Sequence, residues 1–113
     1  MAADIEIRAR AFWTDTEGDE HAVGFAASED PEDGYVIFEG KPEDRKGLYL
    51  EVSDDIFAAK DAVEAVEFTA EGFVLTIRPA MQAKLGMVGS VAVFVGAEDA
   101  DGQAALAVLR GML

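Results

Sequence analysis

Cysteine is absent from this chain of 113 residues, and histidine and tryptophan occur once each. Without cysteine there is no disulfide framework, no thiolate metal site and no cysteine nucleophile. No apolar run approaches the roughly twenty residues of a membrane span, and the first residues lack the basic start and apolar run of a secretory signal. We therefore expect a cytoplasmic chain that inserts into no membrane and depends on its core for stability.

Basic residues are scarce: nine Lys and Arg face 23 Asp and Glu, which gives a formal net charge of -14. Affinity for nucleic acids depends on Lys and Arg, so this balance argues against a nucleic-acid partner. No Lys or Arg lies between Arg10 and Lys41, whereas this stretch holds nine carboxylates. Such a concentration of charge either keeps a protein soluble or attracts a basic protein partner.

Motifs for catalysis and cofactor binding are also missing. His21 is the only histidine, and Ser28, Ser53 and Ser90 lie in no nucleophile-elbow context. No glycine-rich phosphate loop occurs, and the acidic residues follow no metal-ligand spacing. The sequence therefore predicts no enzyme, no cofactor and no metal, while a small carboxylate metal-binding domain assembled from distant residues remains a weaker alternative.

The remaining sequence predicts one domain over residues 1–113, because half of the residues are hydrophobic and no linker interrupts them. Alternation of period two predicts strands over residues 5–13, 21–27, 35–40 and 47–54. Acid, proline and glycine in "SEDPEDG" predict the turn between the second and third strands. If the second strand lies between the first and third, the acidic turns that flank it lie at its opposite ends.

A hairpin, two helices and a further strand complete the expected elements. "AVEFTAEGFVLTIRP" predicts a hairpin that turns near Glu71 and Gly72. A short helix follows Pro79, a strand covers residues 90–96, and leucines at helical spacing predict a terminal helix over residues 98–113. The expected class is α+β, with a mainly antiparallel sheet of about six or seven strands and the C-terminal amphipathic helix packed on one face.

Alternation also predicts which aromatic side chains are exposed. Trp13 has the parity of Ile5 and Ile7, which favours core packing over a role as an anchor for a partner. Phe12 lies on the polar side of the same strand, although a bulge at the strand end could bury it. Tyr49 has the opposite parity to the leucines beside it, which predicts exposure.

Three segments carry a resemblance to a known family. "GYVIFEG", "GLYLEVSD" and "AVEAVEFTAEGFVLTI", in this order and spacing, resemble the Immunity protein 10 family of bacterial polymorphic toxin systems. The resemblance extends over most of the chain, although "IFAAKDAV" and the end of the third strand depart from the family pattern. It implies a small cytoplasmic protein that binds and neutralises a cognate toxin without catalysis.

The acidic stretch and the resemblance together predict a non-catalytic binding protein whose partner is a toxin with a basic surface. An acidic regulatory or adaptor module that binds another basic protein is the alternative. Carboxylates would meet the basic surface while aromatic residues supply the desolvated centre. The predicted partner-binding residues are Trp13, Asp15, Glu17, Asp19, Glu20, Glu29, Asp30, Glu32, Asp33, Tyr49 and Glu51.

Overall fold

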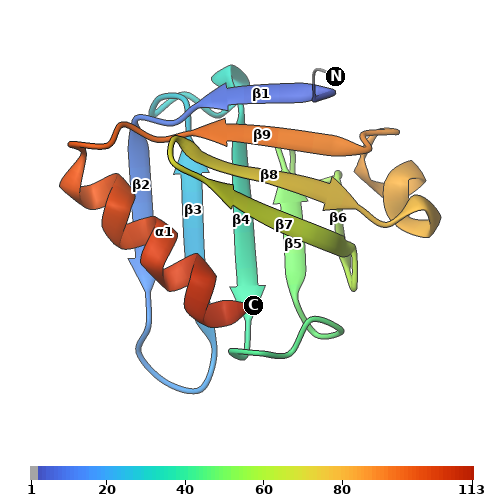
Figure 1. Ribbon diagram of the computed structural model, residues 1–113. Helices are drawn as coiled ribbons and strands as arrows, with labels where there is room; N and C mark the ends of the chain where they lie inside the picture. Colours follow the sequence, from blue (N-terminus) through green and yellow to red (C-terminus); the bar gives the residue numbers. More distant parts are fainter. Residues whose placement is uncertain (1–2) are drawn as a thin grey trace.

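The computed structural model describes residues 3–113, which form two β-sheets and one α-helix packed against them (Figure 1). One sheet has the order β1-β9-β8-β7 and the other the order β2-β3-β4-β5-β6. The elements are β1 (Ile5–Arg8), β2 (Ala11–Asp15), β3 (His21–Ala26), η1 (Pro31–Asp33), β4 (Tyr35–Gly40), β5 (Tyr49–Val52), β6 (Ala58–Lys60), β7 (Val63–Thr69), β8 (Gly72–Ile77), η2 (Pro79–Leu85), β9 (Ser90–Phe94) and α1 (Ala100–Met112). The α+β class is confirmed, but the predicted single sheet is two sheets with nine strands among these residues.

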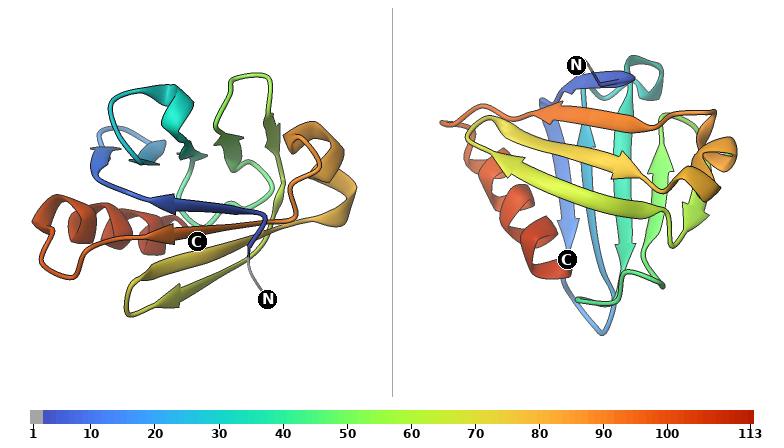
Figure 2. Two further views of the ribbon diagram at one scale, coloured as in Figure 1. Left: turned by 90° about the horizontal axis from the view of Figure 1, so that it is seen from above. Right: turned by 45° about the vertical axis from the view of Figure 1, so that its right-hand side comes forward.

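The two sheets lie face to face with their strands running crosswise, and the core fills the space between them (Figure 2). Phe25 on β3, Phe38 on β4 and Phe73 on β8 are almost fully buried there. The Phe73 ring meets the other two edge-on, with centroid distances of 5.1 Å to Phe25 and 6.0 Å to Phe38. Edge-to-face pairs add about 0.5–1.5 kcal/mol beyond the burial of their apolar surface, so these contacts hold the sheets together.

The predicted first strand is divided between the two sheets. β1 pairs in parallel with β9, whereas β2 pairs antiparallel with β3. The chain passes from one sheet to the other at Ala9 and Arg10, where the Ala9 N–H donates to the carbonyl of Phe94 and the Arg10 N–H to that of Ala26. The crossing reverses which positions face the core. Phe12, not Trp13, therefore packs inward, with its ring 6.0 Å from that of Phe25.

The C-terminal helix α1 packs on the inner side of β2 and β3 beside the four-stranded sheet (Figures 1 and 2). Its first turn is capped by Asp99, whose side chain accepts a hydrogen bond from the Gly102 N–H at 3.0 Å. Leu106 and Leu109 are buried in the core. Arg110 in the last turn lies over the Phe68 ring at 4.7 Å, and a cation there also complements the helix dipole. The predicted terminal amphipathic helix is confirmed.

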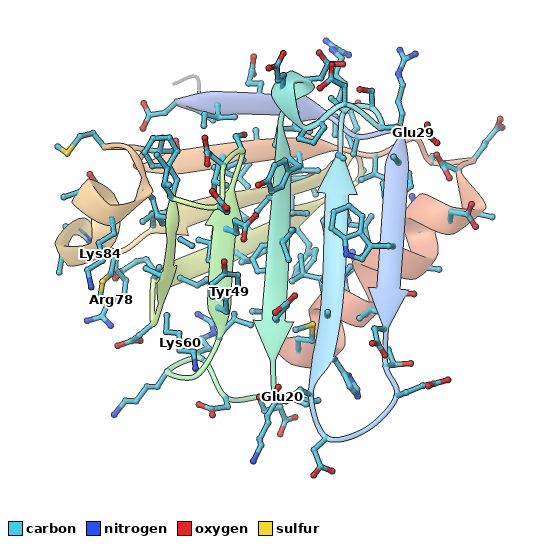
Figure 3. The ribbon with its side chains drawn as sticks, turned by 180° about the vertical axis from the view of Figure 1, so that it is seen from behind. Glu20, Glu29, Tyr49, Lys60, Arg78 and Lys84 are labelled. Atoms are coloured by element: carbon cyan, nitrogen blue, oxygen red, sulfur yellow. The ribbon has the colours of Figure 1, made fainter. Side chains whose placement is uncertain are left out.

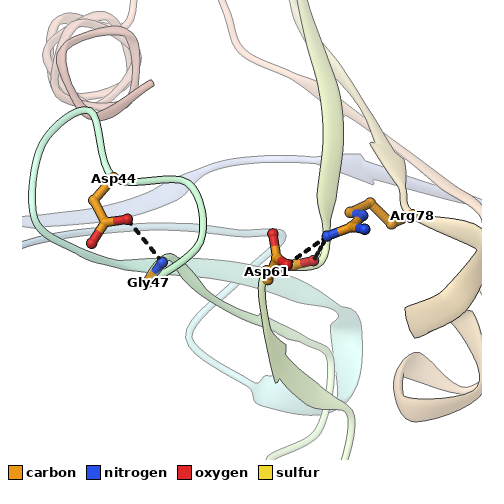
Figure 4. A network of polar contacts seen from close by, with 4 residues as sticks. All are labelled: Asp44, Gly47, Asp61 and Arg78. Atoms are coloured by element: carbon orange, nitrogen blue, oxygen red, sulfur yellow. Dashed lines mark hydrogen bonds and ion pairs between the residues drawn. The ribbon is translucent and has the colours of Figure 1, made fainter.

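The short helix expected after Pro79 is the 3-10 helix η2, which ends at Gly86 in the left-handed conformation (φ 71°). Immediately before it, the Arg78 guanidinium pairs with the Asp61 carboxylate at 2.5 Å and donates to the Asp61 carbonyl at 3.2 Å (Figure 4). Figure 4 also shows Asp44, which accepts from the Gly47 N–H in the β4–β5 loop. Both side chains of the ion pair are more than a third exposed, so the pair contributes little to stability.

Candidate protein-binding face

No α-helix of residues 3–113 covers the outer face of the five-stranded sheet, the side that points away from the core (Figure 3). Side chains alternate along each strand, so the positions between the buried ones face outward. On β3 these positions hold only small residues, Ala22, Gly24 and Ala26. The remaining outward positions on the neighbouring strands are Ala11, Trp13 and Asp15 on β2, Tyr35, Ile37 and Glu39 on β4, Tyr49 and Glu51 on β5, and Ala58 and Lys60 on β6. We call this set the outer face.

Trp13 lies on the outer face and is 42 % exposed, so the prediction of core packing is wrong. It sits directly opposite Gly24 in the β2–β3 ladder. A Cβ atom at Gly24 would lie 2.0–2.3 Å from three atoms of the indole ring. The ring is therefore stacked on the backbone of β3, a position that only glycine leaves free.

A groove of about 390 Å³ runs beside Trp13 along the outer face. Ala26 and Ile37 contribute to its lining, together with Ala11, Pro31 and Tyr35. The charged residues in the lining are two carboxylates, Glu29 and Glu51, and no Lys or Arg of residues 3–113 lines the groove. The small side chains of β3 between larger neighbours create this groove.

Glu51 is held between two tyrosines on the outer face. The Tyr35 hydroxyl donates to Glu51 Oε2 at 2.6 Å, and the Tyr49 hydroxyl donates to Oε1 at 2.5 Å. Burial, followed by the hydrogen bond to Glu51, strongly raises the pKa of Tyr35. The hydrogen bond to Glu51, with burial, raises the pKa of Tyr49 to about 12. Both hydroxyls thus keep their protons beyond the pH at which a free tyrosine ionises, and both donate to the Glu51 carboxylate.

The two acidic turns lie at opposite ends of β3, as the sequence predicts, because β2, β3 and β4 are antiparallel neighbours. Figure 3 shows this separation through Glu29 at one end of the sheet and Glu20 at the other. The β5–β6 turn adds Asp54 and Asp55 at the Glu29 end, where a side-chain hydrogen bond and the charge of Asp54 raise the pKa of Asp55. Negative charge therefore flanks the groove most densely at that end.

The predicted partner-binding residues divide into three groups. Trp13, Asp15, Tyr49 and Glu51 share the outer face, and Glu29 borders the groove. The turn that follows β2 carries Glu17, Asp19 and Glu20, and the turn around η1 carries Asp30, Glu32 and Asp33. The side chains of Asp30 and Asp33 also have local structural roles, because Asp30 caps η1 and Asp33 accepts from the Ser28 hydroxyl at 2.6 Å.

Sequence reasoning missed Tyr35, Ile37, Asp54 and Asp55. Tyr35 and Ile37 alternate with the buried Val36, the same parity signal that predicted exposure for Tyr49. The two aspartates could be placed only once the β5–β6 turn was known to lie beside η1, since Ser53 and Tyr35 are joined by the Ser53 N–H to Tyr35 carbonyl bond.

Three basic side chains lie on the β6 side of the molecule. Lys60 on β6, Arg78 before η2 and Lys84 within η2 lie together on one side in Figure 3, away from Glu29. The outer face therefore has acidic turns at both ends of β3, whereas the β6 side carries Lys60 and the Arg78–Asp61 ion pair.

A second groove, of about 590 Å³, lies on the solvent-facing side of the four-stranded sheet, where Val74, Ala92 and Phe94 contribute to its lining. It is larger, but its lining offers no exposed aromatic ring, because Phe73 is buried and the Arg8 guanidinium lies over the Phe94 ring at 5.6 Å. Among the described residues the large exposed hydrophobic side chains are Trp13, Ile56 and Met87, none of which lines this groove. We therefore place the candidate site beside Trp13.

Residues 3–113 contain no group of three or more His, Asp or Glu side chains placed to hold a metal ion. Within the same residues, no helix has the length and apolar character needed to cross a membrane. The chain matches no protein-family model, no curated protein and no solved structure in the comparisons made. The resemblance to the Immunity protein 10 family therefore stays a prediction.

Proposed function

We propose that this protein is a non-catalytic binding protein that neutralises a cognate bacterial toxin by docking its outer face on a basic surface of that toxin. The observation that carries the proposal is the exposed Trp13 beside a groove whose lining includes two carboxylates and no basic side chain. The segments that resemble the Immunity protein 10 family supply the expectation that the partner is a toxin.

The outer face combines the two features that protein interfaces use. Trp and Tyr are enriched among the residues that contribute most to binding, since they offer a large contact area with few rotatable bonds. Trp13, Tyr35 and Tyr49 provide such contacts here. The acidic turns around them would steer a basic partner toward the face, which raises association rates by roughly ten- to a thousand-fold at low salt.

We expect the open reading frame next to this gene to encode the toxin, and the function is tested by expressing that reading frame with and without this protein in a bacterial host. We expect co-expression to restore growth and the two proteins to co-purify. Growth arrest that persists despite abundant, folded protein would reject the toxin assignment. Binding to a different basic protein, without rescue, would favour the adaptor alternative.

The contribution of the acidic turn is tested with Glu29→Lys combined with Glu32→Lys. These two side chains suit the test better than Asp30 and Asp33, whose carboxylates also stabilise the turn itself. We expect the association rate with the toxin to fall about tenfold at low salt, and the dissociation rate to rise by a smaller factor because Glu29 also lines the groove. The matched control reverses Glu64 and Glu67 on the four-stranded sheet, and an equal loss in the control would contradict a specific role for the turn.

A further inference from the structure

We infer that the groove on the outer face receives one arginine side chain of the protein partner, with its guanidinium between the Glu51 carboxylate and the Trp13 ring. The inference rests on the proposed function, because it names the chemical group through which the basic partner is recognised. Three observations support it: the negative charge of the groove, the unused hydrogen-bond acceptor capacity of the Glu51 carboxylate, and the position of the Trp13 ring.

The Glu51 charge has neutral donors and no cationic partner. Within residues 3–113 the one ion pair joins Arg78 and Asp61, on another part of the sheet edge. The two tyrosine hydroxyls each donate one hydrogen bond to a different oxygen of Glu51. A carboxylate offers about four lone-pair sites, so each oxygen retains capacity for one further donor. A guanidinium presents two parallel N–H groups that suit such a pair of oxygens.

The cross-strand register places an aromatic ring and this carboxylate on one line across the sheet. Trp13 faces Gly24, Gly24 faces Ile37, and Ile37 faces Glu51 on consecutive strands. Because Gly24 has no side chain, the Trp13 ring leans over β3 toward Ile37 and the groove. The groove thus has an apolar middle with an aromatic ring on one side and a fixed anion on the other.

This arrangement suits an arginine better than other ligands. An anion would meet Glu29 and Glu51 with no cation in the lining. A guanidinium stacks on aromatic faces and is more weakly hydrated than the ammonium of lysine, so it loses less on entering a partly apolar groove. The aliphatic part of the arginine would lie on Ile37 and Ala26, which contribute to the groove lining.

The test uses a tryptophan-free hexa-arginine peptide, acetylated and amidated, because Trp13 is the only tryptophan and its fluorescence reports on the groove. Titrations are made in about 150 mM salt to screen general attraction to the acidic chain. Glu51→Gln is compared with Glu67→Gln, which removes the same charge from the other sheet. We expect Glu51→Gln to weaken binding at least about fivefold, as loss of a charge-assisted hydrogen bond predicts, and Glu67→Gln less than about twofold.

Hexalysine provides the second comparison, and we expect it to bind at least about threefold more weakly because it cannot stack or form the paired hydrogen bonds. Equal weakening by the two glutamine variants, or equal affinity for the two peptides, would overturn the inference. If Glu51→Gln does not fold, as judged by circular dichroism, the binding site is mapped from changes in the amide chemical shifts of the unaltered protein when hexa-arginine is added. Changes centred on Trp13, Ile37 and Glu51 would support the inference, and changes confined to the acidic turns would reject it.

Failure of the inference and failure of the proposed function give different results. If rescue from the toxin succeeds but the peptide shows no dependence on Glu51, only the arginine assignment is rejected. If the peptide binds through Glu51 but no toxin is neutralised, the groove still recognises a guanidinium and the toxin assignment is rejected.

Discussion

Replacing Gly24 by alanine should have opposite effects on stability in the presence and in the absence of the Trp13 ring. With the ring present, an added Cβ would lie 2.0 Å from its nearest atom, so the ring must leave its position over β3. Trp13 is 42 % exposed, and the covered part of a large aromatic side chain amounts to roughly 130 Å². At about 25 cal/mol per Å², losing all of that contact costs about 3 kcal/mol.

Two effects reduce this cost. The displaced ring recovers part of its contact elsewhere on the sheet, and alanine is favoured over glycine in a strand by about 0.5–1 kcal/mol. We therefore expect Gly24→Ala to lower the free energy of unfolding by about 1–2 kcal/mol in the unaltered protein. In a Trp13→Ala background the same substitution meets no ring and should raise stability by about 0.5–1 kcal/mol.

The measurement is a double-mutant cycle in urea followed by far-ultraviolet circular dichroism, which does not depend on the tryptophan. The coupling between positions 13 and 24 should be about 2 kcal/mol, since contacting residues couple by about 0.5–3 kcal/mol. In the single Gly24→Ala variant the Trp13 emission should also shift to longer wavelength as the ring becomes hydrated. A similar effect of Gly24→Ala in both backgrounds would refute the stacked position of the ring.

Three further outcomes follow from the structure. Gly72→Ala should destabilise the protein by about 3 kcal/mol or more in urea unfolding. The φ of Gly72 is 139°, and an added Cβ would lie 1.9 Å from the Val93 carbonyl oxygen. Full retention of stability would contradict this backbone conformation. Met87→Gly should raise stability by about 0.5–1 kcal/mol, because Met87 is exposed and its φ of 65° lies in the left-handed region, which favours glycine. A loss of stability would argue against that conformation. Absorbance at 295 nm should show no tyrosine ionisation near pH 10, because Glu51 and burial raise the pKa values of both tyrosines, that of Tyr49 to about 12. Since these pKa values are raised on folding, their stabilisation is complete below pH 10 and is lost as the pH rises through the folded-state values, which are about 12 for Tyr49 and higher for Tyr35. A titration step near pH 10 would contradict the two hydrogen bonds.

Local alternation was enough to predict most elements but not their assignment to sheets. The strands β3, β4 and β5, the β7–β8 hairpin, β9 and α1 all follow patterns that the sequence displays. Alternation says which residues share a face, but not which of two sheets a strand joins. The pairing of β1 with β9 joins residues more than eighty positions apart, and β6 is a three-residue edge strand, "AAK", without any alternation.

The prediction of core packing for Trp13 was wrong for the same reason, because alternation does not show where the chain passes from one sheet to the other. Ile5, Ile7 and Trp13 keep one parity only if residues 5–13 form one strand, and the crossing at Ala9 and Arg10 breaks that register. Gly24 offered a signal that could have corrected it. A glycine inside an otherwise apolar strand often marks the close approach of another group, and here that group is the Trp13 ring.

The position of Glu51 separates recognition from solubility as the role of the acidic residues. A carboxylate that serves solubility is best placed in water with its side chain mobile, because ordering and partial burial both cost free energy. Glu51 is instead half-buried on an apolar part of the sheet and fixed by two tyrosine hydroxyls. Those hydroxyls stabilise the anion and leave its charge in place, so the groove keeps a negative charge that forms no ion pair within residues 3–113. The turns at Glu20 and Glu29 would bring a basic partner near, whereas Glu51 would determine where its guanidinium binds.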